Sequence, residues 1–260
     1  DRIGDWSSDV CSSDLSTAWS NFRLSAETFA TRHRCYFLDF AQFGRSDMVP
    51  VHGPLLGWHA RKLLGFMDAL GLERVHLINQ SLGGAVALRL AADSPQRVGR
   101  LISIGAQPVD RGVLQPLPLF SKHAATLMSD YYLSDGGPSI SKMRVLLGRY
   151  ELHNDELLDD ENLRLRFEAS DNASFIQLLQ TPGAFGEWES LLPVLDRVQA
   201  PTLLCWGLHD WFGSVDVPMM MLNRLPDARL HVFGNAAHHL QSECPDEFNR
   251  LALSFIGAHE

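Results

Sequence analysis

A serine, an aspartate and a histidine follow three predicted strands of this 260-residue chain, in that order. Ser81 comes just after the apolar run 75–78 and directly before a predicted helix. Asp210 and His238 likewise come just after two apolar runs nearer the C-terminus. A serine hydroxyl becomes a nucleophile when a histidine takes its proton and a carboxylate holds that histidine in the right tautomer. The three residues therefore predict hydrolytic chemistry by a Ser81–Asp210–His238 triad.

The residues around Ser81 fit a sharp turn between a strand and a helix. Gly83 and Gly84 are small enough for the turn to tighten until the hydroxyl stands clear of the sheet. The N–H of Leu82, at the helix N-terminus, would face a developing oxyanion. Asn79 stands where this motif has its first glycine, and we expect it to be tolerated because asparagine visits left-handed backbone conformations. Alone, the serine could equally lie in an ordinary turn.

Asp210 and His238 also have plainer interpretations, as a turn-capping carboxylate and as a surface or satisfied core histidine. His239 and His209 compete as the base, but each is one residue away from the position that the strand ends favour. The order serine, aspartate, histidine, each just past the carboxyl end of a strand, favours the triad.

Alternating helical and strand patterns surround these residues. Helices are predicted over 19–34, 58–70, 82–92 and 245–256, and strands over 35–40, 75–78, 101–104, 201–206 and 229–233. This alternation predicts an α/β fold in which helices cover both faces of a mostly parallel sheet. Residues 111–184 show helical patterns without a convincing strand. They are predicted to form a lid over the carboxyl edge of a core made of 15–110 and 185–260.

Composition narrows the possible partners. The formal net charge is −9 and no Lys/Arg cluster stands out, which argues against a nucleic-acid or anionic-membrane partner. No apolar run is long enough to span a bilayer, and no signal segment opens the chain. The dispersed Cys11, Cys35, Cys205 and Cys244 indicate a reducing, cytoplasmic compartment. We expect a small-molecule substrate and no metal or other cofactor, and a homo-oligomer is compatible with the sequence.

Residues 1–14 differ in character from the rest of the chain. They are rich in Ser and Asp and have neither a period of two nor one of 3.6, so we expect no sheet strand there. A native disordered N-terminus is one interpretation. The string from Ile3 to Leu15 resembles the conceptual translation of a sequencing-adapter oligonucleotide, which favours a non-native segment.

Residues 16–260 resemble the α/β-hydrolase superfamily and, within it, the meta-cleavage-product hydrolases. These enzymes split carbon–carbon bonds in ring-opened aromatic and steroid catabolites. The matching motifs are Trp19-Ser20-Asn21-Phe22, Met67-Asp68-Ala69-Leu70-Gly71, Ser81-Leu82-Gly83-Gly84, Leu230-His231-Val232-Phe233-Gly234 with His238, and Asp246-Glu247-Phe248-Asn249-Arg250-Leu251. The resemblance implies hydrolysis of a 2-hydroxy-6-oxo-dienoate ring-fission product to a dienoate and a carboxylic acid.

The resemblance also implies residues that bind the substrate. It places the family's active-site asparagine at Asn21 and its lid arginine, which faces the substrate carboxylate, at Arg166. The plainer interpretations are a helix-start cap and a solvated helix face. Gln80 and His239, which would also line the substrate site, stand where the family typically has asparagine and tryptophan.

A His-Gly-x-Gly-Pro-Gly segment that the family has before the position of Ser16 is absent. In the family it donates the second oxyanion N–H and follows a strand lying between the strands of Cys35 and Val75. The resemblance therefore implies missing N-terminal strands, a gap in the ladder and low activity of the chain. Two rival functions are a carboxylesterase with the same triad and a non-catalytic or truncated hydrolase-fold ligand binder. Aryl-ester turnover without carbon–carbon cleavage would indicate the first, and tight binding without turnover the second.

Overall fold

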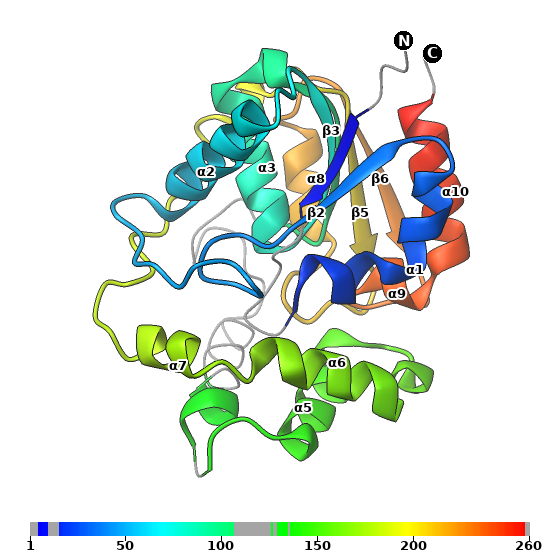
Figure 1. Ribbon diagram of the computed structural model, residues 1–260. Coiled ribbons are helices and arrows are strands. Elements are labelled where there is room, and N and C mark those ends of the chain that lie inside the picture. Colours follow the sequence, from blue (N-terminus) through cyan, green and yellow to red (C-terminus); the bar gives the residue numbers. More distant parts are fainter. Residues whose placement is uncertain (1–4, 10–15, 107–125, 127–128, 135, 258–260) are drawn as a thin grey trace.

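The computed structural model describes residues 5–9, 16–106, 126, 129–134 and 136–257. Their strands form one six-stranded sheet in the order β2-β1-β3-β4-β5-β6, in which every neighbouring pair is parallel (Figure 1). The strands are β1 (Asp5–Asp9), β2 (Arg34–Leu38), β3 (Val75–Gln80), β4 (Val98–Ile104), β5 (Thr202–Gly207) and β6 (Ala228–Phe233). The predicted parallel α/β architecture is confirmed.

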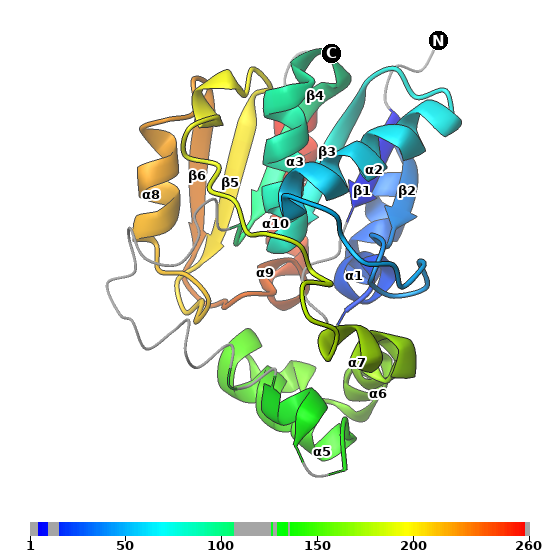
Figure 2. The same cartoon turned by 90° about the vertical axis from the view of Figure 1, so that its left-hand side faces the viewer.

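Helices cover both faces of the sheet. One face carries α1 (Ala18–Ala30) and α10 (Pro245–Ile256), and the other carries α2 (Leu55–Ala69), α3 (Leu82–Asp93) and α8 (Asp216–Leu222) (Figure 2). The short helix α9 (Leu240–Glu243) precedes α10, and single turns lie at η1 (Pro95–Arg97) and η4 (Leu195–Arg197).

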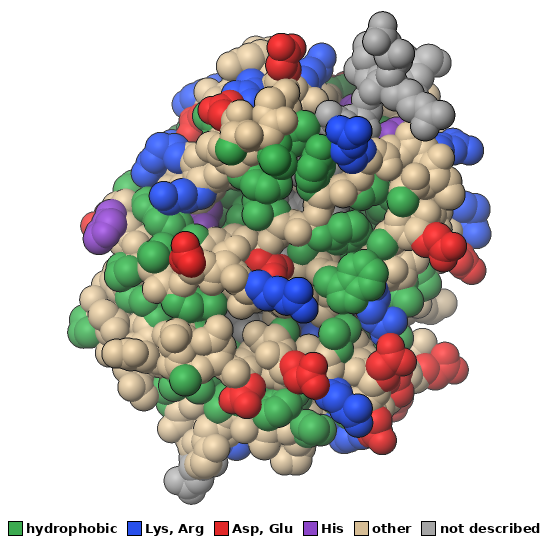
Figure 3. All heavy atoms as spheres, in the orientation of Figure 1, with side chains coloured by type: hydrophobic (Ala, Val, Ile, Leu, Met, Phe, Trp, Pro, Cys, Tyr) green, Lys and Arg blue, Asp and Glu red, His purple; other side chains and the backbone are tan. Residues whose placement is uncertain are grey.

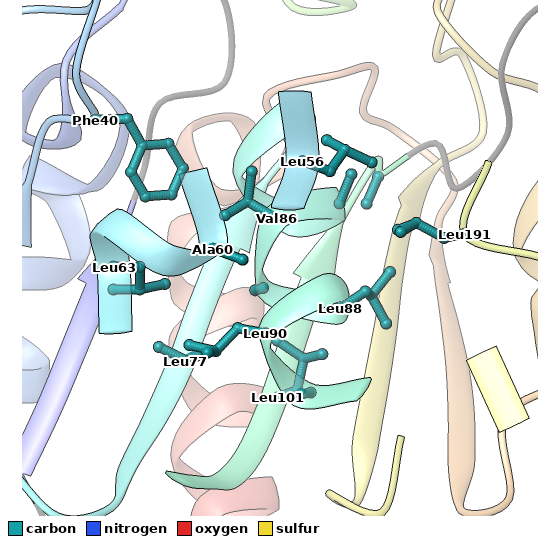
Figure 4. Packing of buried hydrophobic residues seen from close by; sticks show 14 of the residues in the cluster. Phe40, Leu56, Ala60, Leu63, Leu77, Val86, Leu88, Leu90, Leu101 and Leu191 are labelled. Atoms are coloured by element: carbon teal, nitrogen blue, oxygen red, sulfur yellow. The ribbon is translucent and has the colours of Figure 1, made fainter. Parts of the chain in front are cut away.

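The strands have a buried face on each side because alternate side chains point in opposite directions. Leu77 and Leu101 belong to the cluster that packs against α2 and α3, whereas their neighbours Ile78 and Ile102 belong to the cluster under α1 and α10. All four are fully buried. Figure 4 shows the first cluster, in which residues of α2 and α3 such as Leu63 pack onto the strands. Two apolar layers thus hold the sheet between helices.

The helix predicted over 19–34 is too long at its C-terminal end. The helix α1 ends at Ala30, with Thr31 as its C-cap, and Arg34 already begins β2. Residues 34–38 are drawn into the sheet because all of β2 pairs with β1, from Asp5↔Arg34 to Asp9↔Leu38. Tertiary pairing here overrides a local helical pattern.

The prediction that residues 1–14 form no sheet strand is wrong. Asp5–Asp9 forms β1, which pairs with β2 along its whole length and with β3 at Trp6↔His76 and Ser7↔Leu77. The predicted gap between β2 and β3 is therefore occupied. Backbone N–H and C=O groups of two flanking strands can pair with any extended, proline-free segment, whatever its side chains. Residues 5–9 therefore lack the unpaired backbone that is expected of a foreign segment.

A helical segment lies beyond the carboxyl ends of the strands (Figures 1 and 2). It contains α5 (Ile140–Leu146), the π-turn η2 (Leu147–Glu151), the turn η3 (Asp155–Leu157), α6 (Asp160–Ser170) and α7 (Ala173–Leu179). We call residues 140–179 the cap. The described part of 111–184 has no strand, while residues 111–125 of the predicted lid lie outside the described residues. That the cap works as a lid stays a prediction.

Charged side chains on the face shown in Figure 3 are dispersed, with basic groups lying among acidic and apolar ones. Across the described chain, every helix is too short or too polar to pass through a bilayer.

Candidate active site

Ser81 occupies a strained turn between β3 and α3. The strand ends at Gln80 and the helix begins at Leu82, so a single residue makes the turn. Its φ of 52° and ψ of −122° lie in a region that residues with a side chain rarely adopt. Its N–H donates to Ile104 O at 2.7 Å. The turn therefore presents a half-buried serine at the carboxyl edge of the sheet.

The strain lies at Ser81 and not at Asn79. Asn79 is an ordinary residue of β3, and Gln42 and Ser81 are the described non-glycine residues with positive φ. The predicted reason for tolerating Asn79 is therefore wrong, because an extended strand residue needs no left-handed conformation. Gly84 meets the steric demand of the turn instead, since a Cβ there would lie 2.6 Å from Ala106 Cβ.

His238 and Asp210 form a buried hydrogen-bonded pair. His238 Nδ1 and Asp210 Oδ2 are 2.8 Å apart, and the two side chains are 2% and 1% exposed. The other carboxylate oxygen, Oδ1, accepts from Phe212 N at 2.8 Å, which fixes the orientation of Asp210. An ionised carboxylate only accepts hydrogen bonds, so Nδ1 carries the proton and Nε2 is left to accept one.

The electrostatics of this pair favour a basic imidazole. Burial alone would lower the pKa of His238, but the charge of Asp210 and its hydrogen bond outweigh burial and raise that pKa above its ordinary value. Glu151 contributes in the same direction. The arrangement is that of a base whose protonated form is stabilised.

Two glycines that sequence reasoning missed bring these parts together. Gly105, directly after β4, has a φ of +56°, and a Cβ there would lie 3.0 Å from His238 Nδ1 and 3.1 Å from Asp210 Oδ2. The adjacent Ile104 carbonyl is the acceptor for Ser81 N–H, so Gly105 lies between the serine turn and the His–Asp pair. At Gly207 a Cβ would lie 2.0 Å from Ala237 O, so the histidine loop passes closely over the end of β5. Their positions just after or at strand ends were the available signal.

Gln80, His239 and Arg166 meet in one buried network beside the pair. His239 Nδ1 lies 2.9 Å from Gln80 Nε2 and 3.0 Å from Arg166 Nη2. Gln80 Nε2 also donates to His238 O at 2.6 Å. On the other side of the ring, His239 Nε2 lies 2.6 Å from Glu151 Oε2. Glu151 was not predicted, because nothing in the sequence marks this acid among those of the cap.

The plainer interpretations of Arg166 and Asn21 are both wrong. Arg166 is not on a solvated face: it is 1% exposed, and its Nε and Nη1 have no hydrogen-bond partner among the described residues. Burial lowers its pKa to about 10, which still leaves it charged at neutral pH. Asn21 is not the cap of α1, because Thr17 and Ser20 form a capping box there. Asn21 is buried instead, and its Nδ2 donates to Ser16 Oγ at 3.1 Å.

Of the two predicted oxyanion donors, one lies within the described residues. Leu82 opens α3, so its N–H lies at the helix N-terminus next to Ser81. Residues 10–15, where the family resemblance places the second donor, lie outside the described residues. The described parts of the chain contain no group of His, Cys, Asp and Glu that could hold a metal ion.

Comparisons with known proteins agree on one family. The family described as alpha/beta hydrolase fold matches residues 12–245. A 2-hydroxy-6-oxononadienedioate/2-hydroxy-6-oxononatrienedioate hydrolase from a Pseudomonas species is 32% identical over 92% of this chain and 83% of its own length. A 2-hydroxy-6-oxo-6-phenylhexa-2,4-dienoate hydrolase from Comamonas testosteroni is 32% identical over 92% and 82%. The structure of the meta-cleavage product hydrolase from Pseudomonas fluorescens IP01 superposes with a TM-score of 0.79 at 26% identity, covering 98% of this chain and 92% of that chain.

Proposed function

We propose that this chain, a hydrolase that belongs to the alpha/beta hydrolase fold family, cleaves a carbon–carbon bond in a ring-fission product of aromatic catabolism. The substrate class is a 2-hydroxy-6-oxo-dienoate, the class named for relatives that are 32% identical over most of the chain. The observation that carries the proposal is the buried His238–Asp210 pair next to Gly105, the residue after the Ile104 carbonyl that accepts from the strained Ser81 turn.

The proposed chemistry adds water across the bond between the ketone carbon and the dienoate chain. The ketone carbon gains a hydroxyl and leaves as a carboxylic acid, while the dienoate fragment gains a hydrogen. Ser81 acts as the nucleophile or as the group that activates water, and His238 takes the proton and later returns it to the dienoate carbon. Asp210 holds the imidazole tautomer, and Leu82 N–H supplies half of the oxyanion hole.

Arg166 is proposed to hold the substrate carboxylate. Its Nε and Nη1 have no hydrogen-bond partner among the described residues, so either is a charged donor that a substrate carboxylate can satisfy. A buried guanidinium with unused donors is costly unless a ligand completes it. The remaining nitrogen, Nη2, already faces His239, so the arginine is held in place before substrate binds. Gln80 and His239 fix this side of the site, and Asn21 is proposed to line it.

The experiment compares a 2-hydroxy-6-oxo-6-aryl-hexa-2,4-dienoate with a neutral aryl ester. We expect loss of the dienoate chromophore and formation of one equivalent of arylcarboxylic acid, identified by mass spectrometry. Arg166→Ala should lower kcat/KM for the dienoate roughly 10- to 100-fold, the value of a charged hydrogen bond, and spare the ester. Arg164→Ala, an exposed residue of the same helix, is the matched control.

Each outcome separates the alternatives. Ester turnover without dienoate cleavage would indicate a carboxylesterase, and tight dienoate binding without turnover a ligand binder. Equal loss on both substrates in Arg166→Ala would mean that the arginine only supports the structure.

A cytoplasmic location is part of the proposal. The described cysteines Cys35, Cys205 and Cys244 are free thiols, which suits a reducing compartment. Association into a homo-oligomer stays a prediction.

A further inference from the structure

Glu151 of the cap contacts two consecutive residues of the loop that carries His238. Its main-chain carbonyl accepts from His238 N at 3.1 Å, and its carboxylate Oε2 lies 2.6 Å from His239 Nε2. The side chains of Glu151 and His239 are 1% and 0% exposed. One residue of the cap therefore fixes both the backbone of the proposed base and the ring that follows it.

The partners of His239 determine which nitrogen carries its proton. Nδ1 faces Gln80 Nε2 and Arg166 Nη2, and the guanidinium can only donate. Gln80 is also oriented as a donor, because its Nε2 donates to His238 O and its Oε1 accepts from Gln241 Nε2. Nδ1 is therefore the acceptor, and Nε2–H donates to Glu151.

A neutral imidazole thus lies between a cation and an anion. Burial and then Arg166 lower the pKa of His239 to about 3, so the ring is uncharged at neutral pH. Burial alone would raise the pKa of Glu151, but His239, Arg166 and His238 outweigh it and lower that pKa, so the carboxylate is ionised. The trio is close to electrically neutral overall, and its anion is the buried carboxylate of Glu151.

This anion acts on the proposed base directly. The charge of Glu151 raises the pKa of His238, in addition to the larger contribution of Asp210 and against a smaller opposing effect of Arg166. His238 therefore has the Asp210 carboxylate hydrogen-bonded to its ring, while the Glu151 main-chain carbonyl accepts from its N–H and the Glu151 carboxylate bonds to the next residue, His239. Both carboxylates favour the imidazolium that forms when His238 takes a proton.

We propose that Glu151 is a positioning residue for catalysis, which holds the His238 loop through His239 and through the main chain and stabilises protonated His238. The proposal rests on the role of His238 as the base. It gives the cap a part in the chemistry, since Glu151 ends the π-turn η2 and lies 88 residues before His239. It also assigns a role to His239, which stands where the family typically has tryptophan.

The test measures kcat, KM and the pH dependence of kcat/KM for Glu151→Gln, with Glu156→Gln as the control on an exposed acid of the same cap. Glu151→Gln keeps the size and removes the charge. We expect kcat to fall about tenfold or more and the acidic limb of the profile to move to lower pH. Glu151→Asp keeps the charge on a shorter side chain. It should leave the acidic limb of the kcat/KM profile at the same pH and lower kcat.

A second measurement is independent of turnover. The titration of His238 followed by ¹⁵N NMR of the imidazole should show a lower pKa in Glu151→Gln than in wild type or Glu156→Gln. Failure of the wild-type chain to cleave any dienoate or ester would count against the proposed function, while this titration would still test the charge of Glu151. A lower melting temperature with an unchanged His238 titration and an unchanged kcat would overturn the inference.

Discussion

His238 is constrained from several directions at once. Its Nδ1 bonds to Asp210, its main-chain N–H and C=O bond to Glu151 and Gln80, and Gly105 lies against its ring. Few orientations of the imidazole satisfy all these contacts. A base that is preorganised in this way loses little when the proton moves, which is the physical basis of the proposed triad.

The pH dependence of the reaction follows from the Asp210 contact. Because the charge of Asp210 outweighs burial and raises the pKa of His238, kcat/KM should rise with pH through a midpoint above the ordinary value of 6.5. In Asp210→Asn the effect of burial on the pKa of His238 is less opposed, so the midpoint of the pH profile should fall. The rate should also drop roughly 10⁴-fold, because the His238 tautomer with the proton on Nδ1 is no longer favoured. Rate profiles of both proteins and of Asp216→Asn, an exposed control, measure this. An identical midpoint in wild type and Asp210→Asn would contradict the assignment.

Gly105 gives a test of positioning alone. In Gly105→Ala the new Cβ would meet His238 Nδ1 at 3.0 Å, so the ring or the carboxylate must move. A displacement of about 1 Å can lower the rate roughly a hundredfold. Gly53→Ala is the control, since Gly53 also has a positive φ of +84° but nothing lies within 4 Å of a Cβ there.

Both variants should lose a similar, small amount of stability from backbone strain, about 1 kcal/mol. Thermal unfolding and kcat measured side by side distinguish the two effects. If Gly53→Ala loses as much activity as Gly105→Ala, the contact with His238 is not what matters.

The sequence indicated Ser81, Asp210 and His238 because each follows a strand end, and strand ends are visible as apolar runs. Arg166 could be named only through a family resemblance, since a lone arginine on a predicted helix has no local signal. Glu151 could not be named at all. Its partners His238 and His239 are far away in sequence and only tertiary packing brings them together.

At the scale of elements, α2 carries a buried histidine with no catalytic role in this account. His59 is 0% exposed, and both its ring nitrogens lack a hydrogen-bond partner among the described residues. Its ring centroid lies 5.4 Å from that of Phe40 and 5.0 Å from that of Trp58. In this aromatic setting burial lowers the pKa of His59 to about 4.

His59→Phe should make the fold more resistant to acid. The pKa of His59 is about 4 in the folded protein and about 6.5 when the chain is unfolded. Between these pH values the unfolded chain binds more protons at this residue than the folded protein does. The free energy of unfolding of the wild type therefore falls as the pH is lowered from 6.5 towards 4. Relative to its value at neutral pH, the difference in unfolding free energy between variant and wild type should grow by roughly 2 kcal/mol near pH 5 in favour of the variant. Denaturant titrations at both pH values measure it, and parallel pH dependence in the two proteins would contradict it.

The ends of elements were less predictable than their existence. The strand at β3 and the helix at α10 follow clear apolar periods, and α10 has the predicted bounds. The end of α1 was misplaced because residues 31–34 continue a helical pattern, whereas pairing of β2 with β1 requires extended backbone from Arg34.

For the whole molecule, β1 connects two parts of the sheet. It lies between β2 and β3, so its backbone completes the ladder on both sides. Sequence patterns gave no indication of this strand, because they report on side chains and its pairing depends on the backbone.

Ser7→Pro tests whether this pairing contributes to stability. Ser7 is opposite Tyr36 on one side and Leu77 on the other, and proline removes its N–H. We expect the unfolding free energy to fall by roughly 1–3 kcal/mol, with faster amide exchange in residues 34–38 and 75–77. Ser7→Ala keeps the N–H and serves as the control. Equal exchange rates in wild type and Ser7→Pro would mean that β1 contributes nothing to the sheet.

A sheet edge, a strained serine turn and a cap together form the proposed hydrolytic site. Its parts come from β3, β4, β5, the loop after β6 and the cap, so the site exists only when the complete sheet is assembled.

The central claim is that Ser81 reacts in a carbon–carbon bond hydrolysis, and one measurement tests it most directly. It is the kcat of Ser81→Ala with a 2-hydroxy-6-oxo-6-aryl-hexa-2,4-dienoate, compared with wild type under the same conditions. Only one hydroxyl of a half-buried side chain is removed, so the far-UV spectrum and melting temperature should stay close to those of wild type. We predict a loss of about a thousandfold or more in kcat. A variant that keeps most of the wild-type rate would contradict the assignment of Ser81 and the mechanism built on it.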